Sequence, residues 1–155
     1  MRGGRRKIAV SVRQELRPRP LRGERLRALV RRALSRLAAA EADVRVLVVG
    51  DERMERCNRE FLKREGTTNV IAFPDEGPGE RRPERIAGDI LVSAPTCLAQ
   101  TREWAGTPEE RVFYFILHGM LHLAGYDHVT GAADARRMRR RETDLYSSIL
   151  GPDRP

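Results

Sequence analysis

The pattern of apolar and polar positions along the chain predicts both strands and helices. Four short runs rich in β-branched residues are typical of strands: residues 8–12, 44–49, 69–73 and 86–92. Apolar residues that recur every three or four positions predict one helix over residues 21–40 and a last helix over residues 132–149. Because residues 44–49 are apolar with little alternation, we expect this strand to be covered on both faces of its sheet.

Start signals predict three further helices. They lie at Asp51, at Ser93 or Thr96, and at Thr107. We expect the first of these helices to end near residue 63 and the second near Trp104. The third signal is the strongest, because Thr107 is followed by Pro108 at the first helical position and by two acidic residues in the first turn. Residues 75–85 are rich in glycine, proline and charge and predict an exposed loop.

The order of these elements predicts an α+β fold. We expect a small mixed four-stranded sheet packed with about five helices. A chain of 155 residues is long enough for one compact domain and too short for two independent ones, so residues 1–155 are interpreted as a single domain. The pattern leaves the order of the strands in the sheet open.

The composition indicates a basic protein of a reducing compartment. Lys and Arg number 30 against 22 Asp and Glu, a net charge of +8 that attracts polyanions, although a genome's codon usage also explains an arginine excess. Cys57 and Cys97 lie outside any C-x-x-C spacing and predict neither a disulfide framework nor a thiolate zinc cluster. No apolar stretch is long enough to cross a bilayer. We therefore expect a cytoplasmic protein without a membrane partner.

The candidate chemistry lies in one short segment. The chain has three histidines, and all of them fall within residues 118–128. His118 and His122 are four residues apart and so share one face of a helix, while Gly125 can end that helix in a left-handed conformation and turn His128 back toward them. Three neutral imidazoles with an open fourth position are typical of catalytic zinc. The spacing predicts one zinc ion per chain that activates a water molecule for hydrolysis, and it disfavours the alternative of three ordinary core or surface histidines.

The spacing also matches the zinc-protease motif H-E-x-x-H-x-x-G-x-x-H, except at its second position. Gly119 stands where those proteases carry the glutamate that serves as general base. This difference disfavours a peptidase or another small metallohydrolase. Asp127 is the nearest carboxylate in the segment, and it could accept a proton or orient a histidine. Asp127 could equally be a turn residue that caps its own backbone.

The segment His-Gly-Met-Leu-His-Leu-Ala-Gly-Tyr-Asp-His at residues 118–128 closely resembles the signature of the YbeY family, bacterial rRNA maturation factors. Residues 58–74 and the Gly-Asp-Ile element at residues 88–90 extend the resemblance. It implies a compact α+β fold, a three-histidine zinc site and cleavage of single-stranded RNA by a zinc-dependent endoribonuclease. The implied partners are rRNA and the small ribosomal subunit with its proteins. The implied roles are processing of the 3′ end of 16S rRNA and ribosome quality control. No DNA partner is expected.

The chain departs from the family pattern at two positions. The family commonly has an arginine four residues after the asparagine that corresponds to Asn58, and this chain has Leu62. Lys63 or Arg64 could contact phosphate instead, although a shift of one residue on a helix turns the side chain by about 100°. Asn69 replaces the usual aspartate and keeps its hydrogen bonding without its charge.

The candidate catalytic residues are therefore Asp127, Lys63 and Arg64, beside the metal ligands His118, His122 and His128. The sequence leaves open whether water or the 2′-hydroxyl of the RNA is the attacking group. It also leaves a non-catalytic alternative, an assembly factor in which zinc is structural and the basic surface binds rRNA or a ribosomal protein.

Overall fold

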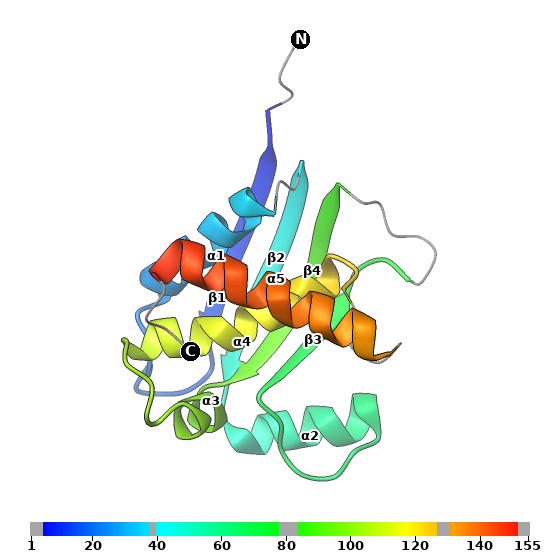
Figure 1. Ribbon diagram of the computed structural model, residues 1–155. Helices are drawn as coiled ribbons and strands as arrows, with labels where there is room; N and C mark the ends of the chain where they lie inside the picture. Colours follow the sequence, from blue (N-terminus) through cyan, green and yellow to red (C-terminus); the bar gives the residue numbers. More distant parts are fainter. Residues whose placement is uncertain (1–4, 38–39, 78–83, 127–130, 152–155) are drawn as a thin grey trace.

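The chain folds into four strands and five helices within residues 5–37, 40–77, 84–126 and 131–151, which a computed structural model describes (Figure 1). The elements in chain order are β1 (Lys7–Gln14), α1 (Gly23–Arg36), β2 (Glu41–Val49), α2 (Asp51–Leu62), β3 (Val70–Pro74), β4 (Arg85–Ser93), α3 (Ala94–Gln100), α4 (Pro108–Leu123) and α5 (Ala132–Leu150). The predicted α+β class, with a mixed four-stranded sheet and five helices, is confirmed. Of the predicted loop at 75–85, residues 78–83 lie outside the described residues.

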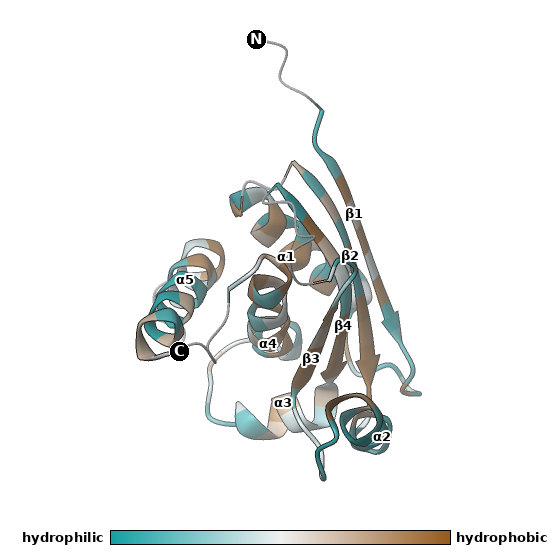
Figure 2. Ribbon diagram, turned by 90° about the vertical axis from the view of Figure 1, so that its right-hand side faces the viewer, coloured by the Kyte–Doolittle hydropathy of each residue, from teal (hydrophilic) through white to brown (hydrophobic). Residues whose placement is uncertain are grey.

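The sheet has the strand order β1-β2-β4-β3. β1, β2 and β4 are parallel, and β3 is an antiparallel edge strand that pairs with β4, with Ala72 opposite Ile90. Helices α1, α4 and α5 lie on one face of this sheet, and α4 is sandwiched between the sheet and α5 (Figure 2). α2 lies on the opposite face and covers only one end of it (Figure 2).

Partial coverage by α2 corrects the prediction that the second strand is buried on both faces. Along β2, buried residues alternate with half-buried ones as far as Val48, and only the last residue, Val49, breaks the alternation. Val49 and Leu47 reach the small core beneath α2, whereas Arg45 lies beyond that core. Arg45 pairs there with Asp89 of β4, from Arg45 Nε to Asp89 Oδ1, over 2.9 Å. The open part of this face is therefore charged and solvated.

α4 is the central helix of the main core. Its residues Val112, Phe113, Ile116, Leu117, Met120 and Leu121 are fully buried. Thr107 caps the helix, since its hydroxyl accepts a hydrogen bond from the Glu110 amide over 3.2 Å and the Glu110 carboxylate accepts one from the Thr107 amide over 3.4 Å. This reciprocal capping confirms the predicted helix start. None of the described helices combines the length and the apolar character that a membrane span requires.

The start of α2 differs in detail from the prediction, whereas that of α3 agrees with it. Ser93, one of the two predicted candidates, is the N-cap of α3, and its hydroxyl accepts a hydrogen bond from the Thr96 amide over 3.4 Å. The N-cap of α2 is Gly50, and Asp51 is the first helical residue rather than the cap. The Asp51 carboxylate instead accepts hydrogen bonds from the hydroxyls of Ser93, over 2.6 Å, and Thr96. These bonds hold the pKa of Asp51 below its ordinary value and join the first turns of the two helices.

The end of α3 lies earlier than predicted. α3 ends at Gln100, and Trp104 lies beyond it in the following turn, where its amide donates to the Thr101 carbonyl over 2.9 Å. The Trp104 ring packs edge-on against Tyr114 of α4, with the ring centroids 4.9 Å apart. Packing against α4, rather than continuation of α3, therefore accounts for the apolar character at this position.

Gly88 allows the closest approach between β3, β4 and α4. A β-carbon at this position would lie 2.4 Å from the Phe73 carbonyl oxygen and 2.7 Å from Leu123 Cδ2. Both distances are shorter than any normal contact, so the backbone of β3 or the end of α4 would have to move. The glycine of the Gly-Asp-Ile element is thus required for packing.

We predict that Gly88→Ala lowers the free energy of unfolding by about 2–3 kcal/mol, because the added methyl group overpacks rigid backbone. Urea denaturation followed by circular dichroism measures the change. Gly23→Ala is the matched control, since a β-carbon there meets only Gln14 Nε2 at an ordinary 3.6 Å. A Gly88→Ala protein as stable as this control would contradict the packing argument.

Candidate metal centre

Two histidines of α4 point at one another from the same helix face. His118 and His122 are one helical turn apart, and their Nε2 atoms are 3.2 Å apart. The rings are nearly perpendicular, with an interplanar angle of 81° and centroids separated by 4.8 Å. Both residues are half-buried. The structure thus brings together the rings of two of the three predicted ligands.

The opposite nitrogen of each ring is held by an acceptor. His118 Nδ1 lies 2.7 Å from Glu142 Oε2, and His122 Nδ1 lies 3.1 Å from the carbonyl oxygen of Tyr126. A carbonyl oxygen and an ionised carboxylate only accept hydrogen bonds, so each Nδ1 carries the proton and donates. In the neutral rings both Nε2 atoms are then unprotonated, and their lone pairs face the same point.

This donor set fits a metal ion. Two lone pairs 3.2 Å apart repel each other unless a cation lies between them. Nitrogen ligands at the usual 2.0–2.1 Å from a tetrahedral zinc ion are about 3.3 Å apart, close to the separation observed here. A shared proton is the other cation that could bridge the pair. The chemistry and spacing of the two nitrogens are those of adjacent ligands of one ion.

Glu142 is a part of this site that the sequence analysis did not identify. It lies on α5, is only 4% exposed, and approaches His118 from the side opposite to His122. Tyr114 lies one turn before His118 on α4. Burial, and then the interaction of its hydroxyl with Glu142, raise the pKa of Tyr114 above its ordinary value, so the phenol keeps its proton.

A signal for Glu142 is present in the sequence. The buried residues of α5 recur at helical spacing and are Met138, Glu142, Leu145, Tyr146 and Ile149. Glu142 is the one carboxylate on this otherwise apolar stripe. A charged residue on a stripe that faces the core needs a polar partner, so its position alone indicates a buried interaction.

Gly125 ends α4 as predicted. Its φ is +99°, in the left-handed region, and the Tyr126 amide donates to the Leu121 carbonyl over 2.9 Å. The Gly125 amide donates to the His122 carbonyl over 3.0 Å, which completes a Schellman motif. This turn places the Tyr126 carbonyl beside the His122 ring.

The predicted third ligand, His128, and the candidate Asp127 lie outside the described residues. Within the described parts of the chain, no three side chains of the types that bind metals lie together. The two converging histidines are two of the three predicted ligands, and the roles of His118, His122, His128 and Asp127 all remain predictions.

The other two candidates, Lys63 and Arg64, follow α2 on the opposite face of the sheet from α4. Lys63 is the C-cap of α2 in a left-handed conformation, and the Arg64 amide donates to the Asn58 carbonyl over 3.2 Å. Both side chains are exposed, as is that of Leu62. Their contact with substrate remains a prediction.

Gly119 faces the sheet rather than the histidines. A β-carbon at this position would lie 3.2 Å from Ile90 Cγ2 and 3.4 Å from Val70 Cγ2. The position that holds the general base in the zinc-protease motif is thus filled by the sheet, which strengthens the case against a peptidase.

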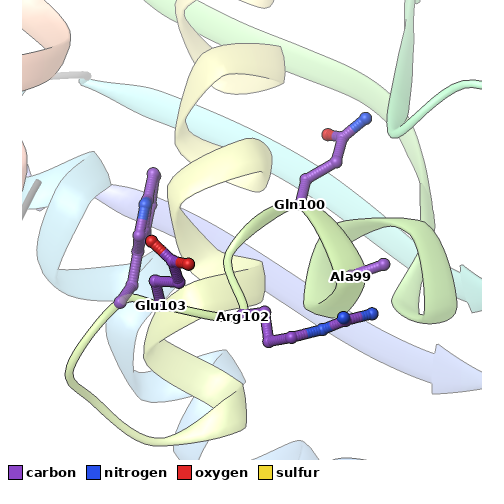
Figure 3. A pocket seen from close by; sticks show the side chains of 5 residues that line it. Ala99, Gln100, Arg102 and Glu103 are labelled. Atoms are coloured by element: carbon purple, nitrogen blue, oxygen red, sulfur yellow. The ribbon is translucent and has the colours of Figure 1, made fainter.

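A hollow on the surface at the end of α3 is not part of this site (Figure 3). It has a volume of about 410 Å³ and is lined by Ala99, Gln100, Arg102, Glu103 and Trp104. None of the candidate metal ligands or catalytic residues lines it.

Comparison with known proteins identifies the family. The family model described as Endoribonuclease YbeY matches residues 12–150. This chain belongs to the YbeY endoribonuclease family. Relatives with the name endoribonuclease YbeY include one from Geobacter metallireducens, 36% identical over 92% of this chain and 95% of its own length. Another, from Chloroflexus aurantiacus, is 38% identical over 79% of this chain and 86% of its own length.

A solved structure supports the fold of this YbeY family member. The solution structure of TM1509 from Thermotoga maritima covers 92% of this chain and 89% of its own, with a TM-score of 0.64 and 22% sequence identity. At that identity the likeness concerns the fold alone. The resemblance drawn from residues 118–128 is confirmed, and an endoribonuclease is by definition a hydrolase that acts on the phosphodiester bonds of RNA. The YbeY family is metal-dependent.

We predict that Gly119→Glu, which restores the protease motif, creates no peptidase. The carboxylate would be forced against Ile90 and Val70, and we expect the free energy of unfolding to fall by about 2–4 kcal/mol. Gly119→Ala, the matched control, should change it by less than about 1 kcal/mol, because a methyl group needs only a small shift of Ile90. A stable Gly119→Glu protein that hydrolyses unstructured peptides would overturn this interpretation.

Proposed function

We propose that this protein is a zinc-dependent endoribonuclease that cleaves single-stranded RNA, with one zinc ion per chain bound by His118, His122 and His128. The convergence of two Nε2 atoms at 3.2 Å is the observation that carries the proposal. Membership of the YbeY endoribonuclease family supports RNA as the substrate. On the same resemblance we propose a role in the cytoplasm, in maturation of the 3′ end of 16S rRNA and in ribosome quality control with the small subunit.

A bound zinc ion supplies Lewis acidity to phosphoryl transfer. His118 and His122 would hold the ion through Nε2, and Glu142 and the Tyr126 carbonyl fix the two rings from their Nδ1 sides. Asp127 accepts the proton of the attacking group or orients a histidine. The ends of a cleaved oligonucleotide identify the attacking group, since a 5′-phosphate indicates water and a cyclic phosphate indicates the 2′-hydroxyl of the RNA.

The basic character of the chain supports a polyanionic substrate. The net charge is +8, and α5 carries five arginines, at positions 136, 137, 139, 140 and 141. On α1, by contrast, Arg27 Nε donates to the Val10 carbonyl over 3.0 Å and Arg31 donates to the Ile8 carbonyl over 3.2 Å. These two arginines stabilise β1, so we assign phosphate contacts to Lys63 and Arg64 rather than to α1.

The second candidate function is a non-catalytic assembly factor that binds rRNA. Leu62 favours it, because the position that commonly carries arginine in the family is here an apolar side chain that is 41% exposed. In that case the zinc would be structural, and RNA affinity would not depend on the metal ligands.

We predict that His122→Ala abolishes RNA cleavage, with a loss on the order of 100-fold or more, because one of the metal ligands is removed. Cleavage of a fluorescent single-stranded oligonucleotide measures it, with circular dichroism as the control for folding. Chelation of the wild-type protein should cause the same loss, and added zinc should reverse it. Unchanged cleavage in both cases would exclude the zinc-dependent mechanism, whereas RNA binding without cleavage in the wild-type protein would favour the assembly factor.

We also predict that Lys63→Ala combined with Arg64→Ala weakens binding of single-stranded RNA and lowers the salt dependence of log K by about 1.4, the value for two lost phosphate contacts. Titrations by fluorescence anisotropy at several salt concentrations measure both quantities. The matched control is Lys7→Ala with Arg13→Ala. It removes the same charge from two exposed positions of β1, which is the edge strand of the sheet opposite to β3. Equal losses from the two pairs would contradict a specific contact.

A further inference from the structure

We infer that Glu142 is a positioning residue of the metal centre, which holds His118 in the tautomer and orientation that direct its Nε2 at the ion. This inference rests on the proposed function, because it assigns a residue to the same metal site. It adds a second helix to that site, since Glu142 belongs to α5, whereas His118 and His122 both belong to α4.

The first support is the geometry of the hydrogen bond. The separation of 2.7 Å between His118 Nδ1 and Glu142 Oε2 is at the short end of the range for a charge-assisted bond. An isolated neutral imidazole can carry its proton on either nitrogen, and a proton on Nε2 would block metal binding. A carboxylate on the Nδ1 side selects the binding-competent tautomer and raises the basicity of Nε2.

The second support is the burial of the carboxylate. The side chain of Glu142 is 5% exposed, and its neighbours on the buried stripe of α5 are apolar apart from the hydroxyl of Tyr146. A carboxylate in such surroundings is unfavourable unless donors satisfy it. The donor is His118 Nδ1, and Tyr114, one turn earlier on α4, also interacts with Glu142. Among the buried residues of α5, Glu142 is the one carboxylate.

A purely structural role, in which Glu142 only joins α5 to α4, makes a different prediction. A structural contact would alter stability and leave the intrinsic affinity of the folded site for metal unchanged. A positioning role would alter the metal affinity and the tautomer of His118 even in variants that remain folded. These two readouts therefore separate the roles.

The experiment compares zinc affinity by competition with a chromophoric chelator. We expect Glu142→Leu to weaken zinc binding by about 10- to 100-fold, the usual effect of losing the hydrogen-bond partner of a metal-binding histidine. Glu142→Gln keeps the shape and one acceptor oxygen and should lose less affinity than Glu142→Leu. Asp144→Leu is the matched control, because it removes a carboxylate from an exposed position of the same helix.

Nitrogen-15 NMR of the metal-free protein provides a second readout that does not depend on metal or activity. We expect the His118 ring to carry its proton on Nδ1 in the wild-type protein and to shift toward the Nε2 tautomer when Glu142 is replaced. Glu142→Gln retains the size of the native side chain and keeps the test available if Glu142→Leu does not fold.

The outcomes distinguish the two proposals. A wild-type protein that binds no zinc overturns the proposed function and this inference with it. A wild-type protein that binds one zinc ion, with unchanged affinity and an unchanged His118 tautomer in the folded Glu142 variants, overturns only the role of Glu142.

Discussion

The site depends on one electrostatic constraint: the Nε2 atoms of His118 and His122 are held 3.2 Å apart. Without a proton or a metal ion between the two nitrogens this arrangement is unfavourable, and each ring is fixed from its other side. Glu142 holds one ring, and a carbonyl at the end of α4 holds the other. The folded structure around the two rings therefore offsets the repulsion between the two nitrogens, and a cation bound between them would remove that repulsion.

The fold is built to keep that pair in place. α4 is enclosed between the sheet and α5, and its core side chains are fully buried, so the helix cannot rotate and carry the two rings away from Glu142 on α5 (Figure 2). Gly119 lets the helix lie directly on β3 and β4, and Gly88 allows the end of the same helix to approach the sheet. Close packing on one side of α4 thus leaves the other side for the histidines and for α5.

Much of this site could be predicted from the sequence because it is encoded locally. The i, i+4 spacing of His118 and His122 fixes a shared face, and Gly125 signals the end of the helix whatever surrounds it. The capping at Thr107 is local in the same sense. These features need only the geometry of one helix, and the structure confirms them.

What the sequence analysis missed depends on contacts between distant elements. The pairing of Glu142 with His118 spans 24 residues, and only the packing of α5 on α4 brings the two together. The strand order, the partial coverage of β2 by α2 and the bond between Asp51 and Ser93 are likewise long-range. The spacing of apolar residues within a single helix or strand does not encode these long-range contacts. A single carboxylate among the buried apolar residues of α5 does, however, indicate a buried polar interaction.

The most direct test of the metal centre is X-ray absorption spectroscopy at the zinc edge on the zinc-loaded protein. A zinc ion bound by His118, His122 and His128 should give about three imidazole nitrogens at roughly 2.0–2.1 Å with one further light ligand, in tetrahedral geometry. Sulfur neighbours, or a shell of oxygen ligands without imidazole scattering, would contradict it.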